Sequence, residues 1–311
     1  MAGCQLGGVA QYGDVDVFRG TEGVEIELMP HAKEVFEGMP FQVQYRIRNK
    51  GAHDVQMYNG RNGEKKGLIS METDHRYFVV SEAEAYPDFY REAVEIKGKS
   101  RELPVGDEAR VIYNLEAKTG VLEAEGVTKR TVPIRLRACY PYKTTATTEV
   151  CIDTDPLNEN PTKPCMASVN LLKGGQGSPI AITSVETRMT RDRSGTYRPY
   201  FDIMLENAGG GQVLNKEFIK QFCEGDFSEM PDTVFNLANV TVKLKGEELD
   251  CGERNTIRID VDEPTMLRCK PANRAHGFTK ADGTFATLLQ IELDYGYTTT
   301  SATSVDVVRL S

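Results

Sequence analysis

The 311-residue sequence contains no tryptophan and only four histidines. No two histidines are three or four residues apart, which excludes the helical zinc-protease motif. The chain also has no G-x-S-x-G nucleophile elbow, and Gly98-Lys99-Ser100 lacks the upstream glycine of a phosphate-binding loop. The sequence therefore contains no catalytic motif of these kinds, and we expect a protein that is not an enzyme.

An excess of positive charge and a long apolar run are also missing. Lys and Arg number 37 against 46 Asp and Glu, a net charge of −9, which argues against a nucleic-acid partner and against a polybasic membrane-surface protein. No run approaches about 18 apolar residues, and no charged-then-apolar signal segment opens the chain. The composition, with 40% hydrophobic residues, is typical of a globular protein of about two domains.

Three segments of the first half match three segments of the second half, in the same order and at an offset of about 155 residues. Any two β-rich segments can look alike, but collinear matches predict an internal duplication. The matched pairs are 18–24 with 172–177, 40–51 with 200–209, and 139–145 with 294–300.

The duplication predicts four parts of the chain. Residues 1–12 form an N-terminal tether, 13–153 and 167–311 form two like domains, and 154–166 form the connection between them. This connection holds three prolines and almost no apolar side chain, which is typical of an extended, semi-rigid linker.

Apolar and polar residues alternate in many short segments, among them 24–28, 43–48 and 134–138. Successive side chains of a strand point to opposite faces, so this period of two predicts sheets with one buried and one solvent-facing side. About seven such segments occur in each half, separated by Gly, Pro and Asn. We therefore predict an all-β fold of two tandem immunoglobulin-like β-sandwiches with little helix.

One helix is expected, at Leu214–Cys223. Leu214, Phe218 and Phe222 are spaced four apart there, behind Asn215 as a candidate N-terminal cap.

Seven cysteines are present, and no two have the two-residue spacing of a zinc site or a thioredoxin-type dithiol. With Cys4 set aside, the remaining six predict three disulfides and an oxidising compartment; six buried free thiols are the alternative. Six cysteines allow 15 pairings. The six candidates are Cys139, Cys151, Cys165, Cys223, Cys251 and Cys269.

Two pairings are favoured by position. Cys139 and Cys151 flank residues 140–150, and would face each other if that segment were a hairpin. Cys251 and Cys269 bracket another expected hairpin. Cys165 and Cys223 would then form the third pair.

A strand that ends in Asn-Lys-Gly at residues 49–51, and again in Asn-Ala-Gly at 207–209, is similar to the early strands of CARDB-type and related immunoglobulin-like domains of bacterial and archaeal surface proteins. Residues 20–23, 35–41 and 49–55 look especially like uncharacterised secreted proteins of small-genome archaea. The resemblance implies an exported, non-catalytic, surface-displayed module, and it brings no settled activity with it.

Met1-Ala2-Gly3-Cys4 resembles the cleavage box of lipoproteins, with Met in place of leucine. On this interpretation Cys4 carries a lipid and residues 5–8 are a flexible tether. The alternative is an unpaired cysteine near the N-terminus.

Two further sites are candidates. Asp153, Asp155, Asn158 and Glu159 offer oxygen ligands of the kind that calcium prefers, although the spacing is not that of an EF-hand; a solvated linker is the alternative. Asn239-Val240-Thr241 is the one N-glycosylation acceptor without a blocking proline.

These features together predict a cell-surface protein, structural or adhesive, that associates with itself or with another surface protein. Residues 1–12 or a sheet edge would make the contact, and repeated head-to-tail contact would produce a filament. A membrane would be contacted only through the lipid, and no cofactor other than calcium is expected. The alternative is a carbohydrate-binding or enzyme-accessory module, which the absence of Trp weakens.

Overall fold

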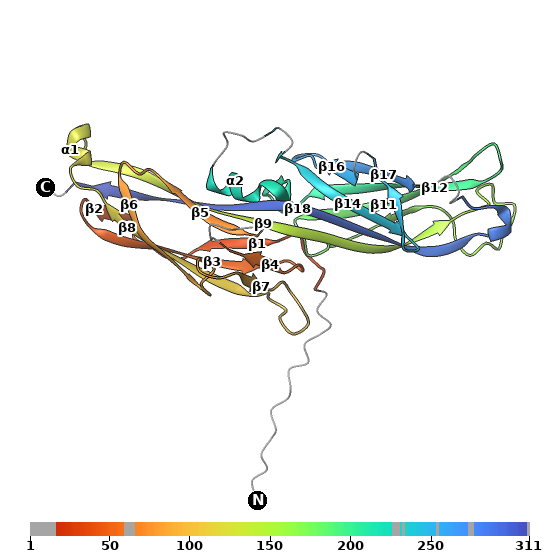
Figure 1. Ribbon diagram of the computed structural model, residues 1–311, viewed down its shortest axis with the longest axis horizontal. Helices are drawn as coiled ribbons and strands as arrows, with labels where there is room; N and C mark the ends of the chain where they lie inside the picture. Colours follow the sequence, from red (N-terminus) through yellow and green to blue (C-terminus); the bar gives the residue numbers. More distant parts are fainter. Residues whose placement is uncertain are drawn as a thin grey trace, which may run out of the picture.

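The molecule is an elongated rod of two β-sandwich lobes placed end to end (Figure 1). The computed structural model describes residues 17–58, 66–225, 231, 234–252, 255–272 and 277–309. Strands dominate these residues and the helices are short, so the prediction of an all-β sandwich fold with little helix is confirmed.

Lobe 1 consists of two facing four-stranded layers. One has the order β1-β3-β8-β6, and the other has the order β2-β18-β9-β5. A small ladder of β4 and β7 and the helix α1 complete the lobe. The bounds are β1 Val24–Leu28, β2 Glu34–Phe36, β3 Pro40–Asn49, β4 Val55–Met57, β5 Leu68–Thr73, β6 Phe78–Tyr86, β7 Val94–Ile96, β8 Glu108–Ala117, α1 Val121–Glu125, β9 Lys129–Ile152 and β18 Phe285–Val308.

Lobe 2 has a layer of order β10-β11-β12-β17 and a layer of order β14-β18-β9. The strand β15 pairs with both β14 and β17 and so joins the two layers along one side. The bounds are β10 Val169–Leu171, β11 Ile180–Arg191, β12 Tyr197–Asn207, β13 Gln212–Leu214, η1 Lys216–Phe218, α2 Ile219–Glu224, β14 Leu237–Leu244, β15 Glu247–Asp250, β16 Thr256–Arg258, β17 Thr265–Pro271 and η4 Lys280–Asp282.

The strands β9 and β18 belong to both lobes. Each is 24 residues long, and they pair antiparallel along their whole length, from Lys129 opposite Val308 to Ile152 opposite Phe285. The first part of β9 and the last part of β18 lie in lobe 1, and their other parts lie in lobe 2 (Figure 1). We call this pair of strands the central ribbon.

The central ribbon makes the two lobes exchange a strand. In chain order, β1, β3, β5, β6, β8 and β9 take the places of strands A to F of a constant-type immunoglobulin sandwich, with layers A-B-E-D and C-F-G. The seventh place, G, is taken by the last part of β18, which comes from the other half of the chain. In lobe 2, the second part of β9 pairs in the same way with β18, next to β14.

The predicted boundaries at 13–153 and 167–311 stay predictions for the limits of the repeat along the chain. In space, each lobe contains strands from both halves. The predicted linker, 154–166, follows the end of β9 and lies in a loop at the free end of lobe 2, not between the lobes. The predicted tether, 1–12, lies outside the described residues.

The register of the central ribbon agrees with the offset of the sequence matches. Pro141 lies opposite Gly296, and Tyr140 and Tyr142 lie opposite Tyr297 and Tyr295. Residues matched in sequence therefore sit at equal distances from the Pro141–Gly296 pair, as a two-fold axis through that pair would place them. The duplication itself stays a prediction.

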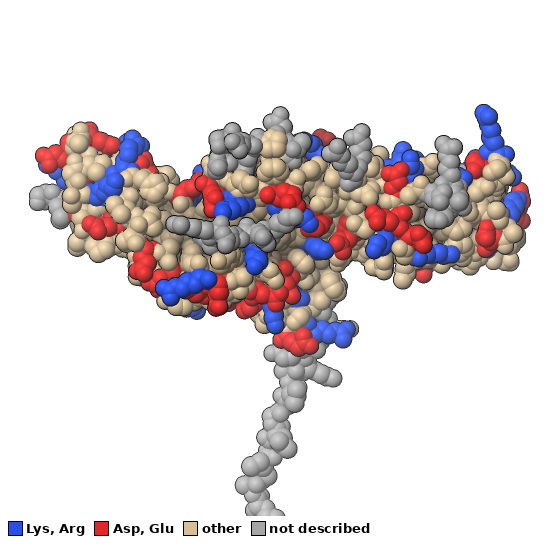
Figure 2. Space-filling model, in the orientation of Figure 1, with Lys and Arg blue, Asp and Glu red and all other residues tan. Residues whose placement is uncertain are grey.

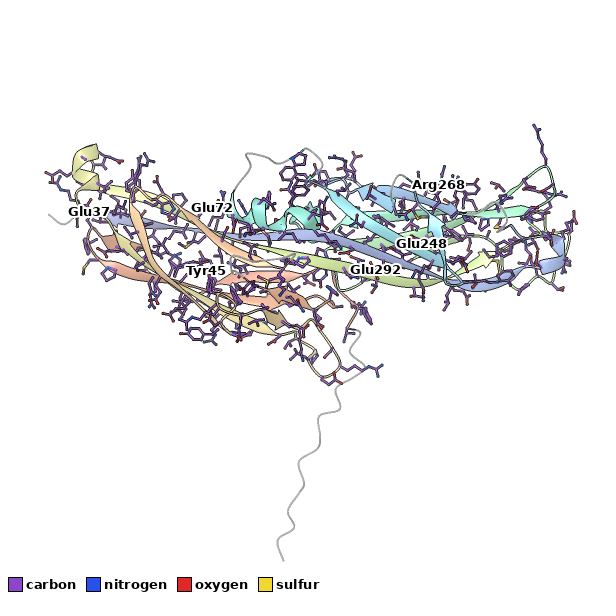
Figure 3. All side chains as sticks on the ribbon, viewed as in Figure 1. Glu37, Tyr45, Glu72, Glu248, Arg268 and Glu292 are labelled. Carbon is purple, nitrogen blue, oxygen red and sulfur yellow. A yellow bond between two sulfur atoms is a disulfide. The ribbon has the colours of Figure 1, made fainter. Side chains whose placement is uncertain are left out.

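The period of two locates the core correctly. In β3, the side chains of Val43, Tyr45 and Ile47 are fully buried and alternate with exposed or partly exposed neighbours. Tyr45 points into lobe 1 (Figure 3). The predicted helix is also present: the Asn215 side chain accepts a hydrogen bond from the Glu217 amide at the start of η1, and α2 follows.

Candidate functional site

The middle of the rod is a cluster of four buried tyrosines. They come from the central ribbon, and neighbouring ring centroids are between 5.8 and 6.2 Å apart. Such spacing is typical of favourable aromatic pairs. The members are Tyr140, Tyr142, Tyr295 and Tyr297, each at most 1% exposed.

Two of the four hydroxyls make matching hydrogen bonds between the two halves of the chain. We call the contact of the halves along the central ribbon the joint. The Tyr140 hydroxyl lies 3.1 Å from the Thr299 hydroxyl, and the Tyr295 hydroxyl lies 2.9 Å from the Thr144 hydroxyl. Each also accepts a backbone N–H from the facing layer of its own half, from Val24 in β1 or from Ile180 in β11. The ribbon is thereby fixed to both facing layers.

The other two tyrosines bind groups in or just after the Asn-x-Gly sequences. The Tyr142 hydroxyl accepts the His53 amide at 3.3 Å and also donates to the carbonyl of Gly177, which precedes β11, at 3.0 Å. The Tyr297 hydroxyl donates to the Asn207 side chain at 2.9 Å and accepts the Gly211 amide at 2.7 Å. Burial raises the pKa of Tyr297 to about 12 and that of Tyr142 still further, so both hydroxyls remain neutral donors at physiological pH.

All six cysteines that were predicted to pair do so. The bonds are Cys139–Cys223, Cys151–Cys165 and Cys251–Cys269, with Cα–Cα distances of 5.9, 5.9 and 4.1 Å. The first joins β9 of the first half to α2 of the second half. The Cys251–Cys269 pairing is as predicted; Cys4 lies outside the described residues.

The predicted Cys139–Cys151 pairing is wrong, and so is the Cys165–Cys223 pairing that followed from it. Residues 140–150 are not a hairpin but the middle of one continuous strand. At about 3.3 Å per residue, Cys139 and Cys151 are roughly 40 Å apart along β9. Neither cysteine can reach the other without breaking the central ribbon.

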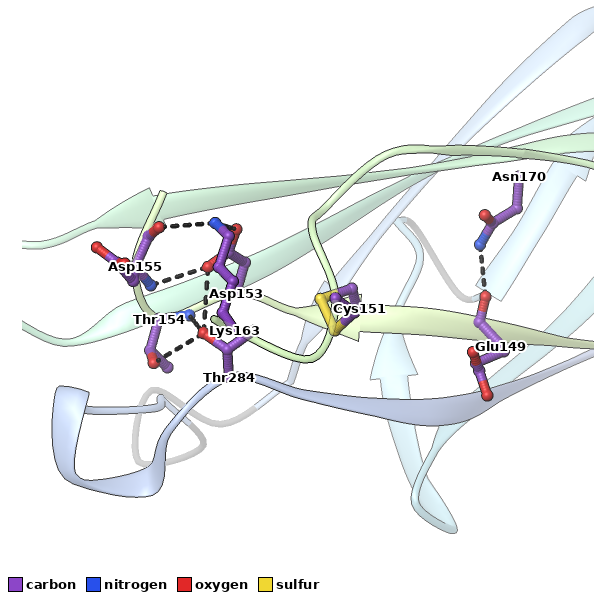
Figure 4. Close-up of a disulfide and its surroundings, with 9 residues drawn as sticks. Glu149, Cys151, Asp153, Thr154, Asp155, Lys163, Asn170 and Thr284 are labelled. Carbon is purple, nitrogen blue, oxygen red and sulfur yellow. Dashed lines mark hydrogen bonds and ion pairs between the residues drawn. A yellow bond between two sulfur atoms is a disulfide. The ribbon is translucent and has the colours of Figure 1, made fainter. Parts of the chain in front are cut away.

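The loop after β9 is closed by Cys151–Cys165 and filled by a buried ion pair (Figure 4). The Lys163 ammonium lies 2.7 Å from the Asp153 carboxylate, with both side chains at most 7% exposed, and it also donates to the Asp155 carbonyl. Burial opposes ionisation of Asp153, but the hydrogen bonds from Lys163 and the Asp155 amide hold its pKa below the usual value.

This arrangement does not support the predicted calcium site. The Asp155 carboxylate accepts the amides of Glu159 and Asn160, and Glu159 pairs with Lys280. Lys163 supplies the positive charge that a metal ion would bring, and Asn158 adopts a positive φ of 57° within the turn. Among the described residues, no group of three His, Cys, Asp or Glu side chains could hold a metal ion.

Asn239, the candidate glycosylation site, is exposed on β14. Its neighbours across the sheet are Asp294 and Thr256. The side chain is therefore accessible to a modifying enzyme, and glycosylation stays a prediction.

An apolar groove of about 370 Å³ lies in lobe 1, between the edge strands β5 and β6. The Tyr90 and Tyr113 hydroxyls meet there at 3.1 Å. On the face shown in Figure 2, acidic and basic side chains are intermixed rather than gathered by sign. The groove is lined by Leu68, Ile69, Ser70, Met71, Val80, Ala83, Tyr90, Tyr113 and Glu224.

The sequence analysis did not predict that two long strands connect the lobes, although the sequence contains features that indicate such strands. The four tyrosines lie in the matched segments 139–145 and 294–300, and the residues that follow them, 143–149 and 298–304, are rich in Thr, which is favoured in strands. An unusually long strand could have been proposed from that pattern. Its partner could not, because alternation does not say which strand pairs with which.

No protein-family model matches the chain, and no curated protein matches it significantly. The resemblance to CARDB-type domains therefore stays a prediction. In the described part of the chain, no helix is long and apolar enough to cross a bilayer.

Proposed function

We propose that this protein is a non-catalytic structural subunit of an extracellular assembly, attached to the cell surface. The observation that supports this most is the central ribbon, whose two 24-residue strands run through both lobes. Two sandwiches on a flexible linker would bend at the linker. Here the connection between the lobes is a hydrogen-bonded pair of strands with a buried aromatic cluster, which favours the role of a stiff spacer.

The direction of the ribbon suits a protein that carries tension. Antiparallel hydrogen bonds lie perpendicular to their strands, so tension along the rod shears many of them at once rather than opening them one by one. The Cys139–Cys223 bond adds a covalent connection between the halves near the centre. We therefore expect the rod to transmit force between a cell surface and whatever it holds.

The disulfides support an extracellular location. Three bonds form from six cysteines, and disulfides persist in oxidising compartments but are rare in the cytosol. Surface attachment through a lipid on Cys4 is part of the proposal. The alternative role, a carbohydrate-binding or enzyme-accessory module, would be tested first at the groove that holds Tyr90 and Tyr113.

Surface labelling of the cells that make the protein tests the proposal. A membrane-impermeant amine reagent should label the protein on intact cells, and non-reducing mass spectrometry should find six cysteines paired, with Cys4 as the exception. Labelling only after lysis, together with seven alkylated cysteines, would overturn the export argument. The cytosolic proteins of the same cells provide the control for lysis.

Self-association is tested with purified full-length protein. Light scattering and electron microscopy should show assemblies larger than a monomer, and fewer of them when residues 1–12 are deleted. A protein that stays monomeric over a wide concentration range, with and without calcium, would exclude a self-assembling subunit and leave display of a foreign partner.

A further inference from the structure

The joint between the two halves is available to a second copy of the chain. Every residue pair of the central ribbon joins the first half to the second half. The Cys139–Cys223 bond and the hydrogen bonds Tyr140–Thr299 and Thr144–Tyr295 do the same. The first half of one chain could make all of these contacts equally well with the second half of another.

Before the Cys139–Cys223 bond forms, the halves are connected by the polypeptide chain, and the free part of this connection is short. The Cys151–Cys165 bond returns the chain to the end of β9, so residues 166–168 alone separate that bond from β10. Met166 and Ser168 are exposed. Short hinges of this kind favour exchange of elements between chains.

Two exposed apolar side chains come directly after this hinge. Leu171 and Val169 of β10 are 67% and 52% exposed. The Asn170 side chain between them donates to the carbonyl of Glu149, so β10 contacts β9 here (Figure 4). An apolar surface at the point where two exchanged chains would separate is a surface on which they can pack.

We propose that two copies of this chain exchange halves, giving a dimer of two rods joined at the lobe 2 ends. In each rod, the first half comes from one chain and the second half from the other, and the two hinges cross at the shared end. Because both forms make the same joint, their balance depends on protein concentration relative to the effective concentration of the tethered half, which is of the order of millimolar. A disulfide oxidant of the oxidising compartment then takes two electrons and two protons from the Cys139 and Cys223 thiols, and the disulfide that forms makes the chosen partner permanent.

This inference rests on the proposed role as a self-assembling subunit. The Cys139–Cys223 bond shows whether the halves of a rod come from one chain or from two, because its two cysteines lie in different halves. Cys251 and Cys269 both lie in the second half and serve as the internal control.

The experiment mixes equal amounts of unlabelled and ¹⁵N-labelled full-length chains, unfolded and reduced. The mixture is refolded and oxidised at about micromolar and at about millimolar concentration, and the products are separated by size and digested without reduction. In the dimer, about half of the Cys139–Cys223 peptides should combine a light with a heavy segment, as random pairing of equal populations requires, while Cys251–Cys269 peptides stay unmixed. The monomer should contain no mixed peptides, and the dimer fraction should rise with concentration.

Dimers or larger assemblies with unmixed Cys139–Cys223 peptides would overturn half exchange and leave the proposed self-assembly standing on another surface. A purely monomeric product at about millimolar concentration would overturn both. The variant Leu171→Ser should lower the dimer fraction about tenfold, because it removes apolar surface from the contact between the rods. Met266→Ser, which changes an exposed apolar side chain on β17, is the matched control and should leave the dimer fraction unchanged.

Discussion

The two lobes share the central ribbon but differ at the side away from it. In lobe 2, β15 pairs with β14 and with β17, so the two layers are joined there, and Cys251–Cys269 fixes the corner. In lobe 1, the corresponding strands β5 and β6 belong to separate layers, and an apolar groove lies between them. The ribbon and its facing strands therefore define each lobe, whereas the strands at the side can change without loss of the architecture.

The largest effect is expected when the two halves of the chain are produced separately. Residues 17–153 alone lack the strand that β18 supplies to lobe 1, and the second part of β9 loses its partner; residues 166–309 alone have the corresponding defects. We expect neither half to form a folded monomer, as judged by size-exclusion chromatography and by loss of a cooperative thermal transition. A mixture of both halves should recover that transition. One half that unfolds cooperatively as a monomer would show that its lobe does not need the exchanged strand.

The disulfide that joins the halves should contribute more to stability than the disulfide within lobe 2. Cys139–Cys223 spans 84 residues and Cys251–Cys269 spans 18. Because a longer closed loop restricts the unfolded chain more, the double alanine variant of the first pair should lose about 4.5 kcal/mol of unfolding free energy and that of the second about 3 kcal/mol. Denaturant titration with unchanged m-values measures both. Equal losses would mean that strain or residual structure outweighs loop length.

A smaller effect is expected from two matched glycines. A Cβ on Gly51 would overlap the Tyr142 hydroxyl and approach the backbone oxygens of Gly177 and Glu22 to 2.7 and 2.8 Å. A Cβ on Gly209 would meet the Tyr297 hydroxyl and the Pro179 Cβ at 2.6 Å, and its nearest backbone atom, the Pro179 Cα, is at 3.0 Å. Backbone cannot move aside as a side chain can. We expect Gly51→Ala to cost about 3 kcal/mol and Gly209→Ala about 2 kcal/mol, by thermal unfolding. The reverse order would show that lobe 1 is the more adaptable lobe.

The smallest effect concerns acid. Asp202 in lobe 2 is 4% exposed and pairs with Arg268 at 2.6 Å and with Arg188 at 3.3 Å; Arg268 is labelled in Figure 3. The hydrogen bond with Arg268 holds the pKa of Asp202 below its usual value. The stabilisation is therefore present above about pH 4 and is lost as the pH falls through the lowered pKa.

Asp202→Asn should thus cost about 1 kcal/mol at pH 7, and the difference from the unaltered protein should shrink below about pH 4. Asp262→Asn, an exposed position on the same lobe, is the control. At the position that sequence matching aligns with Asp202, lobe 1 carries Gln44, so this particular contribution has no counterpart there. A pH-independent difference would mean that the introduced amide disturbs packing rather than charge pairing.

Local features could be predicted from the sequence because their causes are local. Alternation identified β1 and β3, and the spacing of Leu214, Phe218 and Phe222 with Asn215 identified the short helix. The Cys251–Cys269 pairing followed from the expected hairpin that these two cysteines bracket. What failed required knowledge of distant partners: Cys139 pairs with Cys223 because α2 packs over β9, and no local pattern contains that contact.

The loop after β9, which held the predicted calcium site, also depends on a contact that no local pattern contains. The carboxylates of Asp153 and Asp155 were correctly singled out as neighbours, but a sequence pattern of oxygen ligands does not say which positive charge they receive. Lys163, eight residues beyond Asp155, fills that place because the Cys151–Cys165 bond folds the loop back on itself. The sequence alone indicated that these carboxylates bind a cation. Only the tertiary structure shows that the cation is the Lys163 ammonium.

The pair Pro141–Gly296 at the centre of the ribbon has a consequence for orientation. From this pair toward either end, the order Tyr, any residue, Thr, Thr is met, once as Tyr142, Thr144 and Thr145 of β9 and once as Tyr297, Thr299 and Thr300 of β18. These residues by themselves therefore do not distinguish one end of the rod from the other. A polymer with a defined growing end needs subunits whose two ends differ. In this protein the polarity must come from features outside the symmetric part, of which α2 and the disulfide-closed loop at residues 151–165 are the clearest among the described residues.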